Sequence, residues 1–434
     1  DIMQTSVIGF PRVGALRELK FASEKYFRKE ITTEELKDTA KSLRSTHWLK
    51  QKEAGIDYIS SNDFSYYDIM LDTAVIFGIV PKRYKKLGLS ELDTYFAMAR
   101  GYQGAMGDVK ALAMKKWFNT NYHYIVPEVE DDMQITLSGN KLWDEYTEAK
   151  ELGIETKPVV IGAYTLLKLC RYTGEKTVRD FEVAVIHAYQ ELIKKCEEYE
   201  IAWIQFDEPA LVLDMNQEEL ELFHRLYDGI LPVKDKCSIL LQTYFGDVRD
   251  VYQDLIKMPF DGIGLDFVEG KETYHLIENH GFPKDKLLFA GLVNGKNIWK
   301  NHYKDTLQIL DVLKEKGIQT VLSTSCSLLH VPYTMENETV LSQEYLSHFA
   351  FAHEKLTELK ELKQLAQCSD YSTDETYKNN EKLFAEKRNC KNEDVKERLS
   401  QVTEKDYIRL PKRSERQKLQ KKALGIPELP TTTI

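Results

Sequence analysis

The sequence predicts an α/β protein built as a (βα)8 TIM-type barrel with additional N-terminal and C-terminal helices. Three observations predict this fold. Short apolar runs of strand length alternate with longer segments that have helical period and charged surfaces. The runs are continuously apolar, which is typical of parallel strands covered on both faces by helices. Polar residues follow directly after many of the runs, as they do at the carboxyl-terminal face of a barrel.

Nine apolar runs are candidate strands, whereas a closed barrel needs eight. We therefore expect one run to be misread or added to the barrel. An open doubly wound sheet is the alternative, but no Gly-x-Gly-x-x-Gly motif follows any run. The candidate strands cover residues 5–10, 57–62, 122–126, 158–162, 202–207, 238–243, 262–266, 287–292 and 320–323. The amphipathic stretches expected to form covering helices include 178–199, 216–228, 247–257, 271–279 and 303–316.

Composition excludes several classes of protein. The 434 residues, with 59 Lys and Arg against 69 Asp and Glu and 42% hydrophobic content, are enough to bury a core without disulfides or metals. No run approaches the roughly 20 apolar residues of a membrane helix, and residues 1–5 lack a basic region followed by an apolar one, so we expect no signal peptide. The six cysteines are far apart and form no ligand spacing, so we expect free thiols and no metal site. A cytoplasmic protein is the expectation.

The last hundred residues differ from the rest, because residues 336–424 read as successive helices without strands. Residues 376–424 carry 15 Lys and Arg against 8 Asp and Glu. The basic tract 412–418 lacks interleaved aromatic residues, which favours a solvated helix over a nucleic-acid surface. The β-branched run 431–434 resembles the start of a strand. We therefore expect a barrel over 1–335, a helical extension over 336–424, and a linker over 425–434 that leads into a further domain.

A candidate anion site lies after the first predicted strand. Arg17 and Lys20 are three residues apart near the start of a predicted helix, where cations oppose the helix macrodipole. A bound polyanion would remove that conflict, although the residues alone favour an exposed, solvated helix. Lys116 is a second candidate cation, placed among aromatic residues that suit a flat heterocycle with an acidic tail as well as ordinary packing.

Two further motifs are weaker candidates for chemistry. Asp207 and Glu208 close one run, but adjacent strand residues point to opposite faces, so they form no acid/base pair unless the chain turns at Pro209. Cys326 could be a thiol nucleophile, yet no histidine motif accompanies it. Spacing alone therefore predicts a polar barrel face, leaves the anion site and the solvated helix as alternatives, and assigns no catalytic residue.

Several motifs, in order along the chain, resemble the cobalamin-independent methionine synthase family. The resemblance is collinear and covers essentially all 434 residues. It is carried by residues 7–12 (VIGFPR) with 17–20 (RELK), 61–68 (SNDFSYYD), 116–124 (KWFNTNYHY), 205–211 (QFDEPAL), 291–299 (GLVNGKNIW) and 325–332 (SCSLLHVP).

What the resemblance implies is a monomeric two-barrel enzyme that works without cobalamin. It moves a methyl group from 5-methyltetrahydropteroyltri-L-glutamate to L-homocysteine. In the family, the C-terminal barrel carries a zinc ion that holds the homocysteine thiolate, and a histidine that donates a proton. The family's C-terminal barrel opens at a Thr-Thr-Thr-Ile segment, where this chain stops, so we expect its zinc ligands and its histidine to be missing here.

The resemblance implies that five positions bind the folate substrate: Arg17, Glu18, Leu19, Lys20 and Lys116. The expectation is the N-terminal, folate-tail-binding half of such an enzyme, covalently linked to the second barrel and inactive alone, with neither nucleic acid nor membrane as a partner. A stand-alone barrel that binds folate or another polyanion without catalysis is the alternative. A third hypothesis, a single-barrel methyltransferase that uses Cys326, predicts zinc in the isolated chain.

Overall fold

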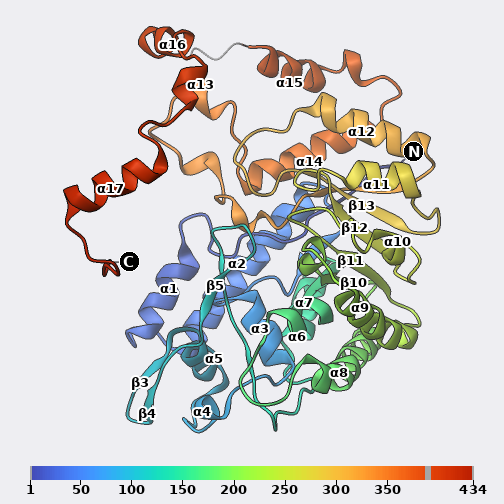
Figure 1. The fold of residues 1–434 in the computed structure, drawn as a ribbon. Helices are drawn as coiled ribbons and strands as arrows, with labels where there is room; N and C mark the ends of the chain where they lie inside the picture. Colours follow the sequence, from blue (N-terminus) through green and yellow to red (C-terminus); the bar gives the residue numbers. More distant parts are fainter. Residues whose placement is uncertain (1, 387–391, 433–434) are drawn as a thin grey trace. The chain divides into compact units, whose positions relative to one another are not determined.

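The computed structural model describes residues 2–386 and 392–432 of the chain, and its centre is a barrel of eight parallel strands (Figure 1). Neighbouring strands follow the order β1-β14-β13-β12-β11-β10-β8-β2. Ser6 forms a parallel bridge with Tyr58, directly before β2, which brings the two ends of the sheet together. The predicted (βα)8 barrel is thereby confirmed. Its strands are β1 (Gln4–Ser6), β2 (Ile59–Ser61), β8 (Thr156–Ile161), β10 (Trp203–Asp207), β11 (Ser238–Gln242), β12 (Gly262–Asp266), β13 (Leu287–Val293) and β14 (Gln319–Thr324).

The ninth candidate run, residues 122–126, is the one that does not belong to the barrel. It forms β6 (His123–Ile125), which pairs antiparallel with β5 (Met114–Lys116) in a hairpin. The run is apolar because Tyr124, Ile125 and Val126 are buried, although they lie outside the barrel sheet. Two further short pairs join β3 (Tyr102–Gly104) with β4 (Gly107–Val109), and β7 (Glu128–Val129) with β9 (Arg171–Tyr172).

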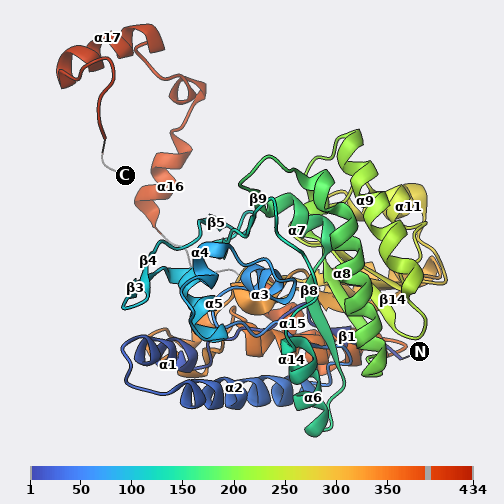
Figure 2. The same ribbon diagram turned by 90° about the horizontal axis from the view of Figure 1, so that it is seen from below.

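Helices surround the barrel, and α1 and α2 run side by side at one edge of it (Figure 2). Four of the five predicted covering helices are found close to their predicted bounds, whereas α10 is much shorter than its amphipathic stretch. The first ten helices are α1 (Glu18–Phe27), α2 (Thr33–Glu53), α3 (Ile69–Ile76), α4 (Lys82–Lys85), α5 (Glu91–Arg100), α6 (Lys141–Glu151), α7 (Ala163–Leu169), α8 (Val178–Glu198), α9 (Gln217–Ile230) and α10 (Tyr252–Leu255). The remaining helices are α11 (Thr273–His280), α12 (Tyr303–Glu315), α13 (Gln343–Leu346), α14 (Ala352–Ala366), α15 (Glu375–Ala385), α16 (Glu393–Ser400) and α17 (Arg413–Leu424).

Helix α8 shows why these segments are helical. Its buried positions include Phe181, Val185, Ala188 and Leu192, which recur every three or four residues and so share one face. A capping box at Thr177 satisfies donors of the first turn. The helix therefore buries an apolar stripe and exposes the polar residues between.

The interior of the barrel has two layers of different polarity. At one level, Leu240, Phe289 and Val321 form an apolar cluster, against which Tyr58 and Trp203 pack. At another level, the strands direct polar side chains inward, and these are fully buried. This polar layer lies below the mouth of the barrel, where the candidate site is built.

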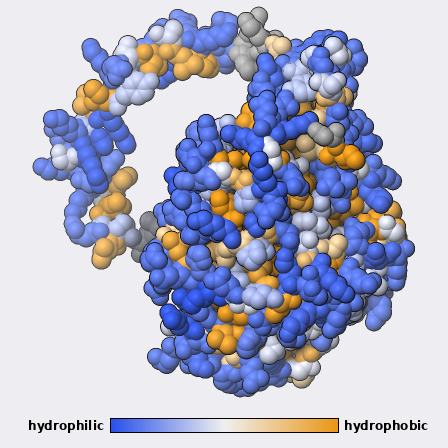
Figure 3. All heavy atoms as spheres, turned by 90° about the vertical axis from the view of Figure 1, so that its right-hand side faces the viewer, coloured by the Kyte–Doolittle hydropathy of each residue, from blue (hydrophilic) through white to orange (hydrophobic). Residues whose placement is uncertain are grey.

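Two compact units make up the chain, Asp1–Phe384 and Ala385–Ile434. Among the described residues of the second unit, α16 and α17 bury no side chain, and the basic tract 412–418 is exposed except at Arg416, which is half-buried. The face of the molecule in Figure 3 is mainly hydrophilic, with apolar side chains scattered over it.

The described residues bear on two expectations, free cysteine thiols and the absence of a membrane-spanning helix. Cys170, Cys196, Cys237 and Cys326 are buried free thiols and Cys368 is an exposed one, as predicted, while Cys390 lies outside the described residues. Within residues 2–386 and 392–432, no helix has the length and hydropathy that crossing a membrane requires.

Candidate functional site

The segment that joins β1 to α1 is fixed across the mouth of the barrel by the loop that follows β2. The backbone N–H of Phe10 donates to Asp63 Oδ2 at 2.9 Å. The Arg12 guanidinium donates to the carbonyl oxygens of Ser65, at 3.0 Å, and of Tyr67, at 2.7 Å. Hydrogen bonds of a charged donor to backbone carbonyls are among the stronger ones, so this segment has a defined position.

The four predicted site residues at the start of α1 divide into two kinds. Arg17 and Lys20 are exposed, whereas Leu19 is buried. Arg17 precedes the helix in a left-handed conformation, with φ 59° and ψ 36°, and its side chain makes no capping hydrogen bond. Glu18 Oε1 accepts the backbone N–H of Leu16 at 2.5 Å. The two cations therefore face solvent, while Glu18 and Leu19 fix the turn that presents them.

Lys116 is the last residue of β5 and is exposed. Trp117, the next residue, turns the other way, because neighbouring side chains alternate along an extended chain. Trp117 is buried and packs at right angles to Phe118 and against Tyr124. The backbone N–H of Trp117 donates to the carbonyl of Tyr122 at 2.7 Å, which closes the hairpin. The rings thus support the hairpin that carries Lys116.

Asp68 supports the hairpin that carries Lys116, and the sequence reasoning assigned it no role. It caps α3, and it accepts the Tyr122 hydroxyl at 2.5 Å and the backbone N–H of Ile125 at 2.9 Å. Burial raises the pKa of this carboxyl to about 6. Arg12 is bound to the same loop, through the carbonyls of Ser65 and Tyr67. The short polar residue before an apolar helix was a signal for a cap, but not for a contact with the distant hairpin.

The polar residues that follow the strands gather at the mouth of the barrel, as predicted. They line a cavity there, among them Asn62, Asp63, Asp207, Tyr244, Ser327 and His330. Asp207 Oδ1 accepts the Gln205 amide at 2.7 Å, and Oδ2 accepts the Tyr244 hydroxyl at 3.0 Å. Lys157 Nζ donates to Gln205 Oε1 at 2.5 Å and to the carbonyl of Val7 at 2.7 Å. A continuous buried hydrogen-bond chain therefore runs from Lys157 to Tyr244.

Burial shifts the pKa values of two groups in this hydrogen-bond network. It raises the pKa of Asp207 to about 7 and lowers the pKa of Lys157 to about 8. Lys157 was missed by sequence reasoning, because a lysine at the edge of an apolar run is usually exposed. Its neighbour Pro158 gave no sign that the ammonium points into the barrel.

Glu208 points away from this network, as the strand alternation predicted. Its carboxylate accepts the backbone N–H of Thr165 at 2.7 Å, that of Tyr164 at 3.1 Å, and the Tyr227 hydroxyl at 2.6 Å. Burial raises its pKa to about 7. Asp207 and Glu208 share no partner among the hydrogen bonds of the described chain, so the geometry gives no support for an acid/base pair.

Loops from several strands cover the mouth. Lys296 Nζ lies 2.9 Å from both Glu269 Oε1 and Asn119 Oδ1, and 5.2 Å from the centre of the Phe245 ring. His330 stacks edge-on to Phe245, and burial followed by the charge of Lys296 lowers its pKa to about 4. The loop carrying Asn119 is thereby connected to the loop that follows β13.

The surroundings of Cys326 do not fit a zinc ion. The thiol is buried after β14, and burial raises its pKa well above the usual value, whereas a zinc ligand must be a thiolate. In the part of the chain that the structure describes, no group of three or more His, Cys, Asp or Glu side chains could hold a metal ion. The predicted catalytic thiol thus gains no geometric support.

A family model and the curated relatives both indicate one family. Residues 4–317 match the family model described as "Cobalamin-independent synthase, N-terminal domain". The chain is 52% identical over 432 residues to the 5-methyltetrahydropteroyltriglutamate–homocysteine methyltransferase of Lactococcus lactis subsp. lactis, covering 100% of this chain and 56% of that protein. It is 51% identical to the protein of the same name from Campylobacter jejuni subsp. doylei, covering 57% of it. The chain therefore spans about half the length of the curated relatives it matches.

Solved structures share the fold at low sequence identity. A B12-independent methionine synthase from Shewanella sp. W3-18-1 superposes with a TM-score of 0.57 at 17% identity, over 85% of this chain and 98% of that one. A putative vitamin-B12 independent methionine synthase from Listeria monocytogenes gives a TM-score of 0.54 at 15% identity, over 84% of this chain and 96% of that one. At such identities the likeness supports the barrel fold alone.

Proposed function

Since the chain belongs to the cobalamin-independent methionine synthase family and matches its N-terminal domain, we propose that it supplies the folate-tail-binding half of a methyltransferase. The reaction we propose for the whole protein transfers a methyl group from 5-methyltetrahydropteroyltri-L-glutamate to L-homocysteine and yields L-methionine. In it, the bond from the folate N5 to the methyl carbon breaks, a bond from sulfur to that carbon forms, and the thiol proton is balanced by a proton gained at N5.

The observation that carries the proposal is the pair of exposed cationic segments on one support. Arg17 and Lys20 stand at the start of α1, and Lys116 at the end of β5, and both segments are bound to the loop of residues 65–68. A triglutamate tail carries several carboxylates, which charge-assisted contacts with Arg and Lys recognise. Anions are also favoured at a helix N-terminus.

Within this proposal each of the five site residues has a separate task. Arg17, Lys20 and Lys116 bind carboxylates of the tail. Glu18 and Leu19 hold the turn in place, since the former closes it through the backbone of Leu16 and the latter is anchored in the apolar cluster of Ala40, Leu43 and Phe64. No step is assigned to a catalytic residue of this chain.

We further propose that the 434 residues do not catalyse methyl transfer alone. The family's zinc and proton-donating histidine are expected in the length of the relatives that this chain does not span, and the residues around Cys326 do not fit a zinc ion. A monomeric state and a cytoplasmic location stay predictions from the sequence.

Replacing Lys116 tests the proposal in the full-length protein. Lys116→Ala should weaken triglutamate folate by roughly 1–3 kcal/mol, the range of a charge-assisted contact, and monoglutamate folate by much less. Lys115→Ala is the matched control, because Lys115 is exposed on the same strand and points to its other face. Equal losses for the two folates, or equal effects of the two variants, would contradict the proposal.

A further inference from the structure

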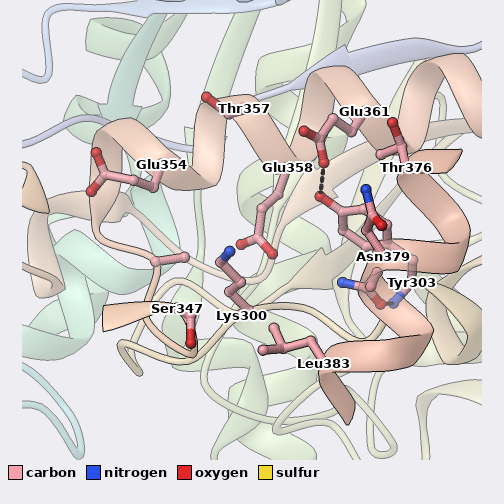
Figure 4. A pocket seen from close by; sticks show the side chains of 12 residues that line it. Lys300, Tyr303, Ser347, Glu354, Thr357, Glu358, Glu361, Thr376, Asn379 and Leu383 are labelled. Carbon is pink, nitrogen blue, oxygen red and sulfur yellow. Dashed lines mark hydrogen bonds between the residues drawn. The ribbon is translucent and has the colours of Figure 1, made fainter. Parts of the chain in front are cut away.

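A cavity of about 390 Å³ lies outside the barrel and apart from the proposed folate segments (Figure 4). It is bounded by α14, by α15 and by the residues that enter α12, and all of its lining residues belong to the first compact unit. None of these residues belongs to the proposed folate segments or to the cavity at the barrel mouth. The side chains that line it are mainly charged or polar, which is unusual for a packing defect, since empty cavities in proteins are apolar.

Hydrogen bonds between the three elements hold the walls in place. The backbone N–H of Asn301 donates to Glu358 Oε2 at 2.6 Å. The Tyr303 hydroxyl donates to Glu361 Oε2 at 2.5 Å, an interaction drawn in Figure 4. From α15, Asn380 accepts the backbone N–H of Tyr303 and donates to the carbonyl of Asn301, both at 2.9 Å. The cavity is therefore preformed rather than loosely packed.

The charge of the lining is negative. Glu354, Glu358 and Glu361 recur every three or four residues on α14 and so share one face, whereas Lys300 is the cation among the lining residues. The residues contributed by α15 are neutral, among them Thr376 and Asn379. A cationic ligand would complement this lining.

Both carboxylate oxygens of Glu354 have hydrogen-bond partners within the fold, whereas only one oxygen of Glu358 has a partner. Both oxygens of Glu354 accept hydrogen bonds, from the Thr334 hydroxyl at 2.9 Å and the backbone N–H of Met335 at 2.8 Å. Glu358 is only 4% exposed, and its Oε1 has no hydrogen-bond partner. Figure 4 shows its carboxylate directed into the cavity. In the described chain, neither Lys300 nor Lys355 forms an ion pair with it, although both charges act on it.

A buried acceptor without a donor is costly, and the natural way to satisfy it is a ligand with N–H donors. A bare metal ion is disfavoured as that ligand, because no three carboxylates of the described residues are close enough to share one. From these contacts we infer that the cavity is a binding site for a small organic cation that carries a primary ammonium group. The ammonium would donate to Glu358 Oε1, with Glu361 and the neutral side chains of α15 around it.

Titration of the 434-residue chain with small amines tests this inference. The probes are 1,4-diaminobutane and, as its neutral isostere, 1,4-butanediol, followed by calorimetry at about 0.15 M salt, where exposed charges farther apart than about 8 Å are screened. We expect saturable binding of the diamine and none of the diol. Equal binding of both, or no binding of the diamine, would overturn the inference.

Variants of the lining glutamates test whether the diamine binds in this cavity. Glu358→Gln should lower the affinity for the diamine at least tenfold, and Glu361→Gln should lower it severalfold while keeping an acceptor for the Tyr303 hydroxyl. Glu344→Gln removes the same charge from an exposed position outside the cavity and should leave the affinity unchanged. Circular dichroism establishes that each variant is folded. If Glu358→Gln does not fold, Glu361→Gln decides the matter alone, and an affinity equal to that of Glu344→Gln overturns the inference.

The pH dependence gives a second readout. Burial raises the pKa of Glu358 to about 7, against the opposing charges of Lys355 and Lys300 and with that of Glu361. From α12, the neutral Tyr303 hydroxyl faces the same carboxylates, and α15 presents neutral side chains. The diamine should therefore bind more tightly as pH rises through about 7, where Glu358 ionises. An affinity that does not change between pH 6 and 8 would contradict the role of Glu358.

Discussion

Charged side chains are buried at the barrel mouth but exposed in the segments at its rim. At the mouth, Asp207 and Lys157 are buried, and each has hydrogen-bond partners within the chain. At the rim, Arg17, Lys20 and Lys116 are exposed, and none forms an ion pair among residues 2–386 and 392–432. Internal hydrogen bonds therefore engage the polar side chains at the mouth, whereas the rim cations face solvent.

The largest effect should come from breaking the buried chain at the mouth. Asp207→Ala leaves the Gln205 amide and the Tyr244 hydroxyl without their acceptor, and each buried donor left unsatisfied typically costs about 1–3 kcal/mol of unfolding free energy. Urea denaturation measures the loss. Asp108→Ala, at an exposed position on β4, is the control and should change stability by less than about 0.5 kcal/mol. A similar loss in both variants would mean that the network contributes no stability.

A pH series should sharpen the same contrast. The pKa of Asp207 rises from 3.8 to about 7 on folding and that of Glu208 from 4.5 to about 7, because both are buried. The unfolded chain therefore releases these protons first, and stability is lost as pH rises from about 4 to 7, by about 1.4 kcal/mol per pH unit for each group. The slope should be shallower in Asp207→Asn. An unchanged slope in that variant would contradict the buried position of the carboxyl.

The smallest effect concerns Arg17 at the rim, where function and stability should move in opposite directions. Its φ of 59° is strained for any residue with a side chain, so Arg17→Gly should raise the unfolding free energy by about 1 kcal/mol while weakening triglutamate folate. Arg17→Lys keeps the charge and the strain, and should change both quantities less. Chemical denaturation and folate titration are the two measurements. A variant that loses stability and affinity together would mean that Arg17 is structural.

Much of the fold could be predicted from the sequence, because the barrel strands are buried on both faces and read as continuous apolar runs. The run 122–126 was the exception, since a buried hairpin strand has the same apolar residues as a barrel strand and only the pairing distinguishes them. The shortness of α10 was missed for a related reason. Periodicity reports which residues are buried, not how far the helix extends.

The candidate site could be predicted in part. The exposure of Arg17, Lys20 and Lys116 agrees with the anion-site reading, and their role in binding folate stays a prediction. The supports could not be predicted, because Asp68 contacts a hairpin more than fifty residues away, and Lys157 is buried by partners from other strands. Glu358 is a similar case, since its unpaired oxygen follows from the packing of three helices rather than from any local motif.

The most direct test of the central claim, that the rim cations hold the folate tail, is calorimetric titration of the 434-residue chain with triglutamate and monoglutamate folate at low and at high salt. We expect triglutamate folate to bind more tightly than monoglutamate folate, and added salt to reduce the difference, because exposed ionic contacts are screened. Equal affinity for the two folates at both salt concentrations, or binding of neither, would contradict it.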